Sequence, residues 1–207
     1  MAKGLIEYVG DDCINALYAA IEARSIRPGI CKTAGLKLVY SPLNGSGLVP
    51  VTHVLGDIGI TDITVVVGYK KEYFFYLEDK FGVSIVVNPD YASRNNSSSI
   101  KRVEDRLGNT YICSSDDYFT ENPFEPYVWK AYYAVEYAEG PTAEWCVQTG
   151  AHDRITGVTI GGEDAWYMIG QVYFDRTFSE TYVPLLDAVY DNPATVDTVS
   201  YTHLTLP

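Results

Sequence analysis

The sequence has few of the side chains that usually bind transition metals or form disulfides. Its 207 residues include three histidines, and none of them has the spacing of a zinc site. The four cysteines lie far apart and include no CxxC pair; they are Cys13, Cys31, Cys113 and Cys146. Such isolated cysteines are typical of reduced thiols, so we expect a cytoplasmic protein without disulfides.

Basic residues and long apolar runs are also scarce. Lys and Arg total 15 against 27 Asp and Glu, a net charge of −12. This balance argues against nucleic acid as a partner, because phosphate binding needs a basic face. No run approaches the roughly 18 apolar residues of a membrane span, and the N-terminal MAKGLIEYVGDD lacks the apolar core of a signal peptide. An acidic surface that only keeps the protein in solution explains the charge equally well.

The residues that are present predict an α/β fold. Hydrophobic residues make up 47% of the chain, enough for a sizeable core. We expect, in order, helix 11–24, strand 36–40, helix 48–55, strand 63–67, helix 70–81, strand 83–88, helix 97–107, strand 110–114, strands 144–149, 155–160 and 165–174, and helix 178–190. This order predicts a mostly parallel, Rossmann-like sheet flanked by helices, followed by an antiparallel C-terminal extension.

Two carboxylates follow an apolar strand in the segment YICSSDDYF. Parallel strands of an α/β sheet have ligand crevices at their carboxyl ends. Mg²⁺ is usually bound by one or two carboxylates together with substrate phosphates. Asp116 is therefore a candidate Mg²⁺ ligand for phosphoryl or nucleotidyl transfer, with Asp117 beside it. The alternative is that the two aspartates only start a solvent-exposed turn.

Three downstream blocks resemble bacterial choline-phosphate cytidylyltransferases of the sugar-nucleotidyltransferase type. They read VVVGYKKEYFFYLEDKFGVSIVVNPDYASRNNSSSIKRVEDRL, YICSSDDYFTENPF and TAEWCVQTG, and the resemblance covers about residues 63–197. It implies a truncated nucleotide-diphospho-sugar transferase-like fold. It also implies transfer of CMP from CTP to phosphocholine, which yields CDP-choline and pyrophosphate. In that family an aspartate at the position of Asp116 binds the catalytic Mg²⁺. An Asn-Asn-x-x-Ser stretch, which matches Asn95, Asn96 and Ser99, lies near the nucleotide.

The implied choline group gives the aromatic residues a candidate role. A quaternary ammonium cannot donate N–H bonds, so proteins hold it with aromatic faces. Trp145 is the first candidate for such a cation pocket, because it lies in the block TAEWCVQTG. Tyr118 and Tyr173 are further candidates. Each of these rings could instead be a core or sheet-packing residue.

The upstream segment resembles a different family. LKLVYSPLNGSGLVPV and VLGDIGITDITVV resemble the start of the second α/β domain of α-D-phosphohexomutases, the phosphoglucomutases and phosphomannomutases. We therefore expect a mutase-like fragment at 1–66, a nucleotidyltransferase-like domain at 67–198 and a non-native tail at 199–207. The tail's YTHLTLP resembles translated sequencing-adapter sequence. Residues 1–66 carry 6 acids and 5 bases against 21 and 10 in the remainder, which agrees with two origins.

The upstream fragment has none of the mutase's catalytic motifs and occupies the place of the cytidylyltransferases' glycine-rich nucleotide loop. Its own loop at 44–47 contains glycine but no basic residue, so it resembles a phosphate-binding loop only loosely. The family's second metal aspartate lies beyond the region of resemblance. These departures predict weak or no activity.

Three hypotheses follow from these patterns. The first is a nucleotidyltransferase-derived domain that uses Mg²⁺, CTP or another nucleotide, and a phosphocholine-like molecule. The second is a phosphohexomutase fragment without catalytic residues. The third is a non-catalytic α/β domain that binds a ligand or a protein. The sequence leaves the oligomeric state open.

Overall fold

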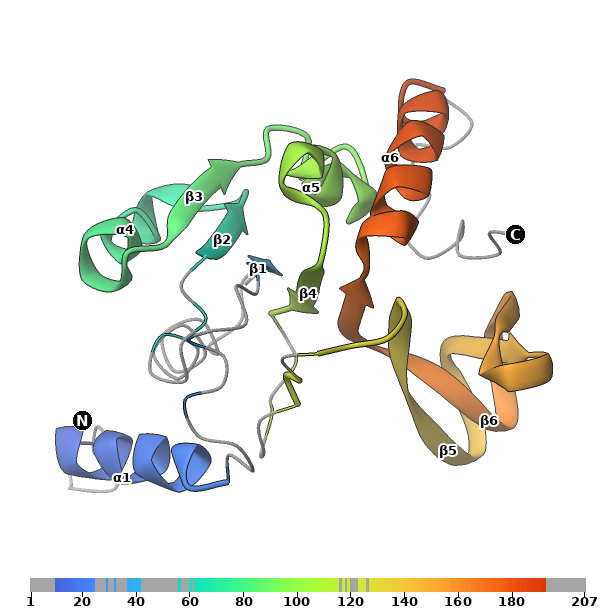
Figure 1. The fold of residues 1–207 in the computed structure, drawn as a ribbon, viewed down its shortest axis with the longest axis horizontal. Coiled ribbons are helices and arrows are strands. Elements are labelled where there is room, and N and C mark those ends of the chain that lie inside the picture. The colour runs from blue at the N-terminus through green and yellow to red at the C-terminus, as the bar shows by residue number, and fades with distance from the viewer. Residues whose placement is uncertain are drawn as a thin grey trace, which may run out of the picture.

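The computed structural model contains one mixed sheet with helices packed against it (Figure 1). It describes residues 10–24, 29, 32, 37–41, 56, 60, 62–115, 117, 119, 123–125 and 127–192. The elements are α1 Asp11–Glu22, β1 Lys37–Ser41, β2 Asp62–Val67, η1 Lys71–Tyr73, α4 Tyr76–Phe81, β3 Ser84–Val87, α5 Ser97–Lys101, η2 Glu104–Arg106, β4 Thr110–Ser114, β5 Tyr132–Thr149, η3 Ala151–Asp153, β6 Ile155–Phe174 and α6 Arg176–Tyr190. No helix within these described ranges is long and apolar enough to cross a membrane.

The six strands follow the order β3-β2-β1-β4-β6-β5. β1 pairs in parallel with β2 on one side and with β4 on the other, and β2 pairs in parallel with β3. β6 runs antiparallel to both β4 and β5. The predicted fold class, a mostly parallel sheet with an antiparallel C-terminal extension, is confirmed.

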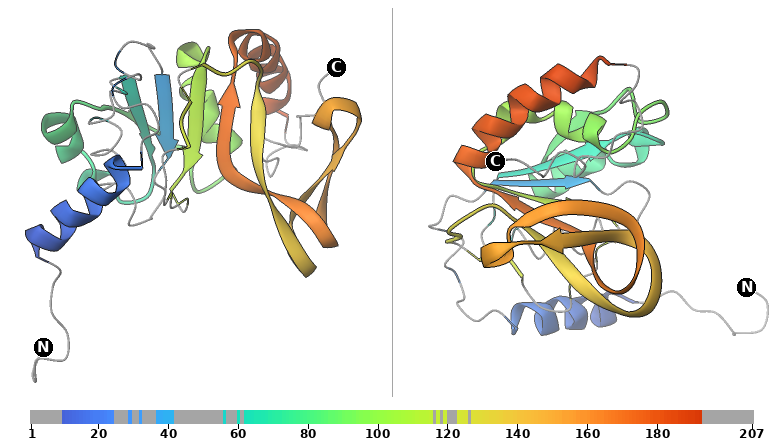
Figure 2. Two further views of the ribbon diagram at one scale, coloured as in Figure 1. Left: turned by 60° about the horizontal axis from the view of Figure 1, so that its bottom comes forward. Right: turned by 90° about the vertical axis from the view of Figure 1, so that its right-hand side faces the viewer.

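The parallel strands are covered on both faces, which is why they consist of nearly continuous apolar residues. In β2 every residue after Asp62 is buried. Leu77 of α4 and Tyr18 of α1 belong to the core on one face. Ile100 of α5 and Leu186 of α6 belong to the core on the other face. The right-hand view of Figure 2 shows α5 and α6 on one side of the sheet and α1 on the opposite side.

Two predicted helices are interrupted in the structure. The expected helix 70–81 consists of η1 and α4, and the expected helix 97–107 consists of α5 and η2. The first contains the run KEYFFY, whose aromatic side chains lose rotamer freedom in a helix. In the second, Val103 has φ −128° and ψ 18°, which is outside the helical region, so the chain leaves the helix between α5 and η2.

The C-terminal strands are longer than the sequence pattern predicted. The expected strand 144–149 is part of β5, and the expected strands 155–160 and 165–174 are joined in β6. Gly140 and Gly161 have φ angles of 78° and 77°. Glycine adopts this conformation without strain, so each strand bends at its glycine instead of ending there.

The predicted domain boundary at residue 66 falls inside the sheet. β2 contains residue 66, and β1, which lies upstream of it, pairs with strands on both sides. The predicted helix 48–55, the loop 44–47 and the tail 199–207 lie outside the described residues. The division into a mutase-like fragment and a nucleotidyltransferase-like domain stays a prediction.

Two fully buried tyrosines differ in what their hydroxyl groups contact. Tyr111 of β4 donates to the backbone carbonyl of Glu125 and accepts from its N–H, both at 2.9 Å. The hydroxyl of Tyr182 in α6 is buried and contacts no hydrogen-bond partner among the described residues. Burial raises the pKa of both phenols above the ordinary value, so both are neutral donors at pH 7.

The two tyrosines predict opposite effects of the same substitution. Tyr111→Phe removes two hydrogen bonds and should destabilise the protein by about 1–3 kcal/mol. Tyr182→Phe removes an unpaired buried hydroxyl and should leave stability unchanged or raise it by about 1 kcal/mol. Urea unfolding of both variants measures this difference. Equal losses would contradict the assigned hydroxyl contacts.

Candidate functional site

The strand order places a topological switch point between β1 and β4. From β1 the chain adds β2 and β3 on one side and then returns to add β4 on the other. Ser41 and Ser114 are register partners and are the last residues of β1 and β4. In open α/β sheets, ligands bind outside the carboxyl ends of the strands at such a point. The residues that follow these two ends are therefore the candidate site.

Asp117 lies beside the end of β4. Its Oδ2 accepts from the N–H of Ser114 at 3.2 Å, and its Oδ1 accepts from the N–H of Gly170 in β6 at 3.1 Å. The pKa of the nearby Cys113 thiol is raised, first by burial and second by the charge of Asp117. Asp117 is thus a carboxylate held between β4 and β6. Asp116 lies outside the described residues, so its predicted role stays a prediction.

The approach of β6 to this turn requires glycine at position 170. A Cβ atom there would lie 2.4 Å from the Cβ of Ser114 and 2.6 Å from Oδ2 of Asp117. Real Cβ atoms do not come so close to other heavy atoms, so a larger residue must displace the turn that carries Asp117. Gly170 therefore allows β6 to pack against Ser114 and Asp117.

The carboxylate oxygens at this edge of the sheet are the type of ligand that Mg²⁺ prefers. Carboxylate oxygens and substrate phosphates are the usual ligands of Mg²⁺, which needs only one or two protein carboxylates. Asp117 provides one, and Asp116 would add a second. Within the described part of the chain, no group of three or more His, Cys, Asp or Glu could hold a metal ion. If Mg²⁺ bound beside Asp117, substrate phosphates would supply the remaining ligands.

The predicted nucleotide-binding residues lie around the start of α5. Asn88, at the end of β3, is buried and its amide nitrogen donates to the hydroxyls of Ser98 and Ser99 at 2.8 and 3.2 Å. Asn95 is exposed and Asn96 is half-buried. The buried Asn88 side chain therefore fixes Ser99 and the helix start against the carboxyl end of β3, on the same edge of the sheet as Asp117.

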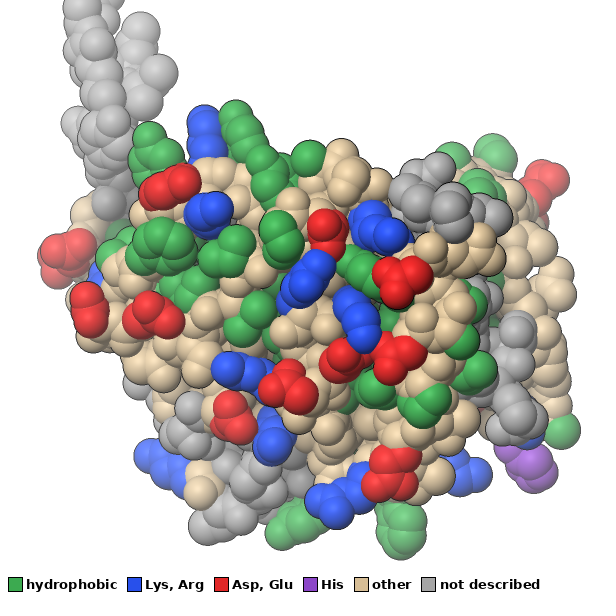
Figure 3. All heavy atoms as spheres, turned by 90° about the horizontal axis from the view of Figure 1, so that it is seen from above, with side chains coloured by type: hydrophobic (Ala, Val, Ile, Leu, Met, Phe, Trp, Pro, Cys, Tyr) green, Lys and Arg blue, Asp and Glu red, His purple; other side chains and the backbone are tan. Residues whose placement is uncertain are grey.

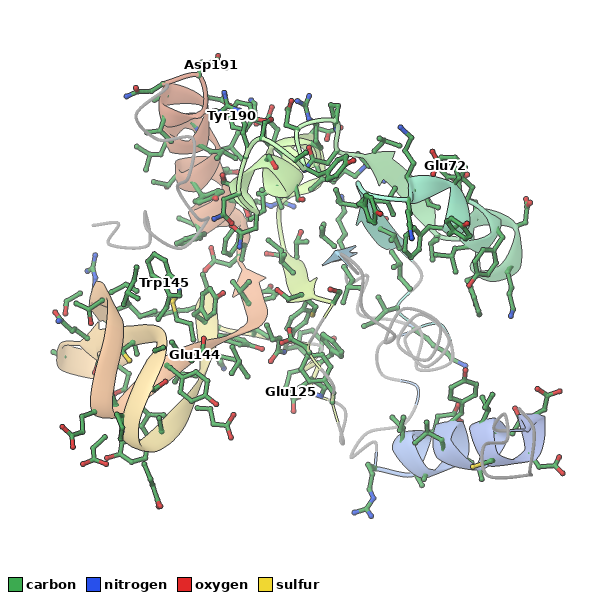
Figure 4. All side chains as sticks on the ribbon, turned by 180° about the vertical axis from the view of Figure 1, so that it is seen from behind. Glu72, Glu125, Glu144, Trp145, Tyr190 and Asp191 are labelled. Atoms are coloured by element: carbon green, nitrogen blue, oxygen red, sulfur yellow. The ribbon has the colours of Figure 1, made fainter. Side chains whose placement is uncertain are left out.

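The segment after β3 is also bound to the C-terminal end of α6. Tyr190 donates its hydroxyl to Oδ2 of Asp90 at 2.8 Å, and Arg102 forms an ion pair with the same oxygen. The guanidinium of Arg94 lies 4.2 Å from the centroid of the Tyr190 ring and donates to the Tyr190 carbonyl. Figure 4 labels Tyr190 near the end of α6, and Figure 3 shows basic and acidic side chains interleaved on this face.

The structure describes two of the three candidate cation-binding rings, Trp145 and Tyr173. Tyr173 is 4% exposed, and its ring lies 4.9 Å from that of Tyr111 and is stacked on Tyr132 at 6.1 Å. It is a core residue in this arrangement. Trp145 is half-buried on β5 opposite Ile160, on the part of the β5–β6 ribbon shown in Figure 4. Tyr118 lies outside the described residues. The cation-binding roles stay predictions.

The β5–β6 ribbon curls back on itself near Trp145. The next residue, Cys146, is a register partner of both Thr159 and Tyr167 in β6. The Tyr167 hydroxyl donates to Oε2 of Glu136 at 2.9 Å. The curl thus brings the Tyr167 ring of β6, together with its bonded partner Glu136 of β5, toward the later part of β5 that carries Trp145.

The sequence reasoning missed Asn88 and Gly170, which hold the site residues in place. Asn88 had a recognisable signal, since a polar residue directly follows the apolar strand and precedes Pro89. Gly170 had none, because a glycine inside a strand pattern does not reveal which distant backbone approaches it.

No family model matches the chain, but its structure is similar to solved nucleotidyltransferases. The CTP:phosphocholine cytidylyltransferase from Streptococcus pneumoniae has a TM-score of 0.73 and 26% identity over 80% of this chain and 82% of that chain. A Bacillus anthracis protein assigned as a glucose-1-phosphate thymidylyltransferase shares the fold, with a TM-score of 0.58 and 17% identity over 82% of this chain and 80% of its own. The chain is a nucleotidyltransferase-like domain.

Within that class, the sequence comparison identifies cytidylyltransferases as relatives. A choline-phosphate cytidylyltransferase of Streptococcus pneumoniae is 32% identical over 143 residues, 69% of this chain and 62% of the relative. A 2-aminoethylphosphonate cytidylyltransferase of Lancefieldella rimae is 33% identical over 165 residues, 77% of this chain and 66% of the relative. The chain is homologous to choline-phosphate cytidylyltransferase-like nucleotidyltransferases, and it spans slightly less than two thirds of these curated relatives.

Substituting Gly170 tests how closely β6 must approach the candidate site. Gly170→Ala should destabilise the protein by about 1–3 kcal/mol because the added Cβ overpacks the turn after β4. Gly108→Ala is the matched control, since a Cβ at Gly108 meets nothing within 4 Å, and it should change stability by about 0.5 kcal/mol or less. Thermal unfolding of both variants measures the difference, and equal midpoints would contradict the close approach.

The Asp90 network predicts a pH dependence of stability. Hydrogen bonds from Tyr190 and Arg102 lower the pKa of Asp90 below the ordinary value of 3.8. The stabilisation is therefore present above pH 3.8 and is lost as the pH falls through the folded-state pKa. The stability difference between the wild type and Asp90→Asn should be largest near neutral pH and shrink below pH 3.8. Urea unfolding at several pH values checks this, and a pH-independent difference would contradict it.

Proposed function

We propose that this chain binds CTP and transfers CMP to a small acceptor that carries a phosphate or phosphonate group, with phosphocholine as the first candidate. The observation that carries the proposal is the similarity to the pneumococcal cytidylyltransferase in both fold and sequence. The carboxylate of Asp117 at the carboxyl end of β4 supports it, because nucleotidyl transfer uses a divalent cation to offset the phosphate charge and a carboxylate can hold such a cation.

The proposed reaction depends on alignment and needs no covalent enzyme intermediate. A phosphate oxygen of phosphocholine would bond to the α-phosphorus of CTP. The bond from that phosphorus to the bridging oxygen would break, and pyrophosphate would leave with the electron pair. Mg²⁺, when bound, would offset the charge on the phosphate oxygens.

We assign the side-chain roles as follows. Asp116 and Asp117 would hold the metal ion, and the two backbone N–H groups that bind Asp117 would keep its carboxylate oriented. Asn95, Asn96 and Ser99 would contact the nucleotide from the edge fixed by Asn88. Trp145 would contact the choline cation, with Tyr118 as a further candidate. Tyr173 packs in the core and is 4% exposed, so it is not assigned this role.

We further propose that turnover is slow. The segment 42–50 follows β1 directly in the sequence, and it contains no Lys or Arg to neutralise nucleotide phosphates. An origin of residues 1–66 in a phosphohexomutase would explain this loop. However, the match to the Lancefieldella relative covers 77% of this chain, and residues 67–207 make up a smaller share than that. The matched span therefore includes residues before position 67.

A second candidate acceptor is 2-aminoethylphosphonate. The relative from Lancefieldella rimae is a 2-aminoethylphosphonate cytidylyltransferase, and the match covers 77% of this chain. A primary ammonium donates hydrogen bonds and needs acceptors, whereas a quaternary ammonium needs aromatic faces. The curled ribbon contains both kinds of group, since Glu144 precedes Trp145 and Tyr167 is bonded to Glu136.

Pyrophosphate release tests the proposed function. It should require CTP, Mg²⁺ and one of the two acceptors, and Asp116→Ala should reduce it by about 10²–10³-fold. Trp145→Ala should lower kcat/KM more for phosphocholine than for 2-aminoethylphosphonate, because only the quaternary cation depends on an aromatic face. Isothermal titration that detects binding of neither CTP–Mg²⁺ nor either acceptor would refute the proposal. Such a result would favour the mutase-fragment or protein-binding alternatives.

A further inference from the structure

Two exposed tyrosines, Tyr69 and Tyr91, form a pair at the carboxyl edge of the sheet. Tyr69 follows β2 by two positions and Tyr91 follows β3 by four. Their rings lie 6.4 Å apart at an interplanar angle of 49°, and the residues are 50% and 46% exposed. Large aromatic groups that stay accessible beside a ligand crevice provide a π-surface for a planar ligand.

The backbone around this pair is fixed by several contacts. A Cβ at Gly68 would lie 2.6 Å from Cβ of Tyr91, so the two segments touch and only glycine permits it. The N–H of Asp90 donates to Oδ1 of the buried Asn88 at 2.9 Å. The carboxylate of Asp90 is bonded to Tyr190 of α6. Tyr91 is thus an exposed ring on an anchored segment, so little ordering entropy opposes binding.

The pair follows β2 and β3, which lie on the other side of β1 from β4 and Asp117. β2 lies two strands away from β4, because β1 separates them. With neighbouring strands about 4.8 Å apart, the ends of β2 and β4 are separated by about 10 Å. A nucleotide whose α-phosphate lies near Asp117 can therefore extend its base toward the ends of β2 and β3. Asn95 and Asn96 lie on the same segment as Tyr91.

We propose that Tyr69 and Tyr91 form the contact surface for the base of the nucleotide. The inference rests on the proposed function and adds to it the residues that hold the base. Lys70, whose Nζ lies 5.3 Å from the centroid of the Tyr69 ring, supplies positive charge beside this surface in an otherwise acidic protein. Stacking accepts any base, so the pair supplies affinity and leaves discrimination between bases to hydrogen-bonding groups.

Isothermal titration of the full chain with CTP–Mg²⁺ and with inorganic tripolyphosphate tests the inference. Tyr91→Ala and Tyr69→Ala should each weaken CTP binding by about 5- to 100-fold and leave tripolyphosphate binding unchanged, because tripolyphosphate has no base. Tyr91→Phe should retain the affinity of the wild type. Tyr76→Ala is the matched control, since Tyr76 is also 46% exposed but lies on α4; it should bind CTP normally. Thermal unfolding confirms that each variant is folded.

The possible outcomes separate the two proposals. If the wild type binds CTP and releases pyrophosphate, but the alanine variants bind CTP as tightly as Tyr76→Ala, the inference is overturned and the proposed function remains. Equal loss of CTP and tripolyphosphate binding also overturns it, because the tyrosines would then act on the phosphates or on the fold. If the wild type binds no nucleotide, both proposals are overturned.

Discussion

Strand β1 hydrogen-bonds to β2 along one edge and to β4 along the other, so the parallel part of the sheet depends on five residues, Lys37–Ser41. A central strand without partners on both sides would leave backbone N–H and C=O groups unpaired in the core. Its position also creates the switch point between β1 and β4. Residues 1–66, which the sequence predicts to be a mutase-like fragment, therefore contain a strand that the sheet requires.

The candidate site is held together by contacts between segments that are distant in the sequence. Asp117 joins the turn after β4 to β6, and Asn88 joins the end of β3 to α5. Arg94 and Asp90 join the next segment to Tyr190 of α6. Each contact fixes backbone before any ligand arrives, which lowers the entropic cost of binding. The same rigidity makes single positions such as Gly170 sensitive to added volume.

The runs of apolar residues and the turn residues between them predicted the positions of β1, β2, β3 and β4 within about one residue. These strands are buried on both faces, so each one is a nearly continuous apolar run in the sequence. The helices were less predictable. The aromatic run KEYFFY disfavours a continuous helix, and Val103 leaves the helical region between α5 and η2; an apolar face alone does not reveal either. The expected strand 144–149 began after Gly140, and the expected strands 155–160 and 165–174 lay on either side of Gly161; in the structure each glycine is a bend within a longer strand.

The sequence by itself determined the α/β class, the carboxylates after β4 and the likeness to cytidylyltransferases, because each of these is recorded in local residue types and their spacing. Only the tertiary structure decided that Tyr173 packs in the core, that Asn88 holds Ser99, and that Gly170 admits the turn carrying Asp117. It also brought Tyr69 and Tyr91 together. These relations depend on which strands become neighbours, and pairing in a parallel sheet joins residues far apart in the chain.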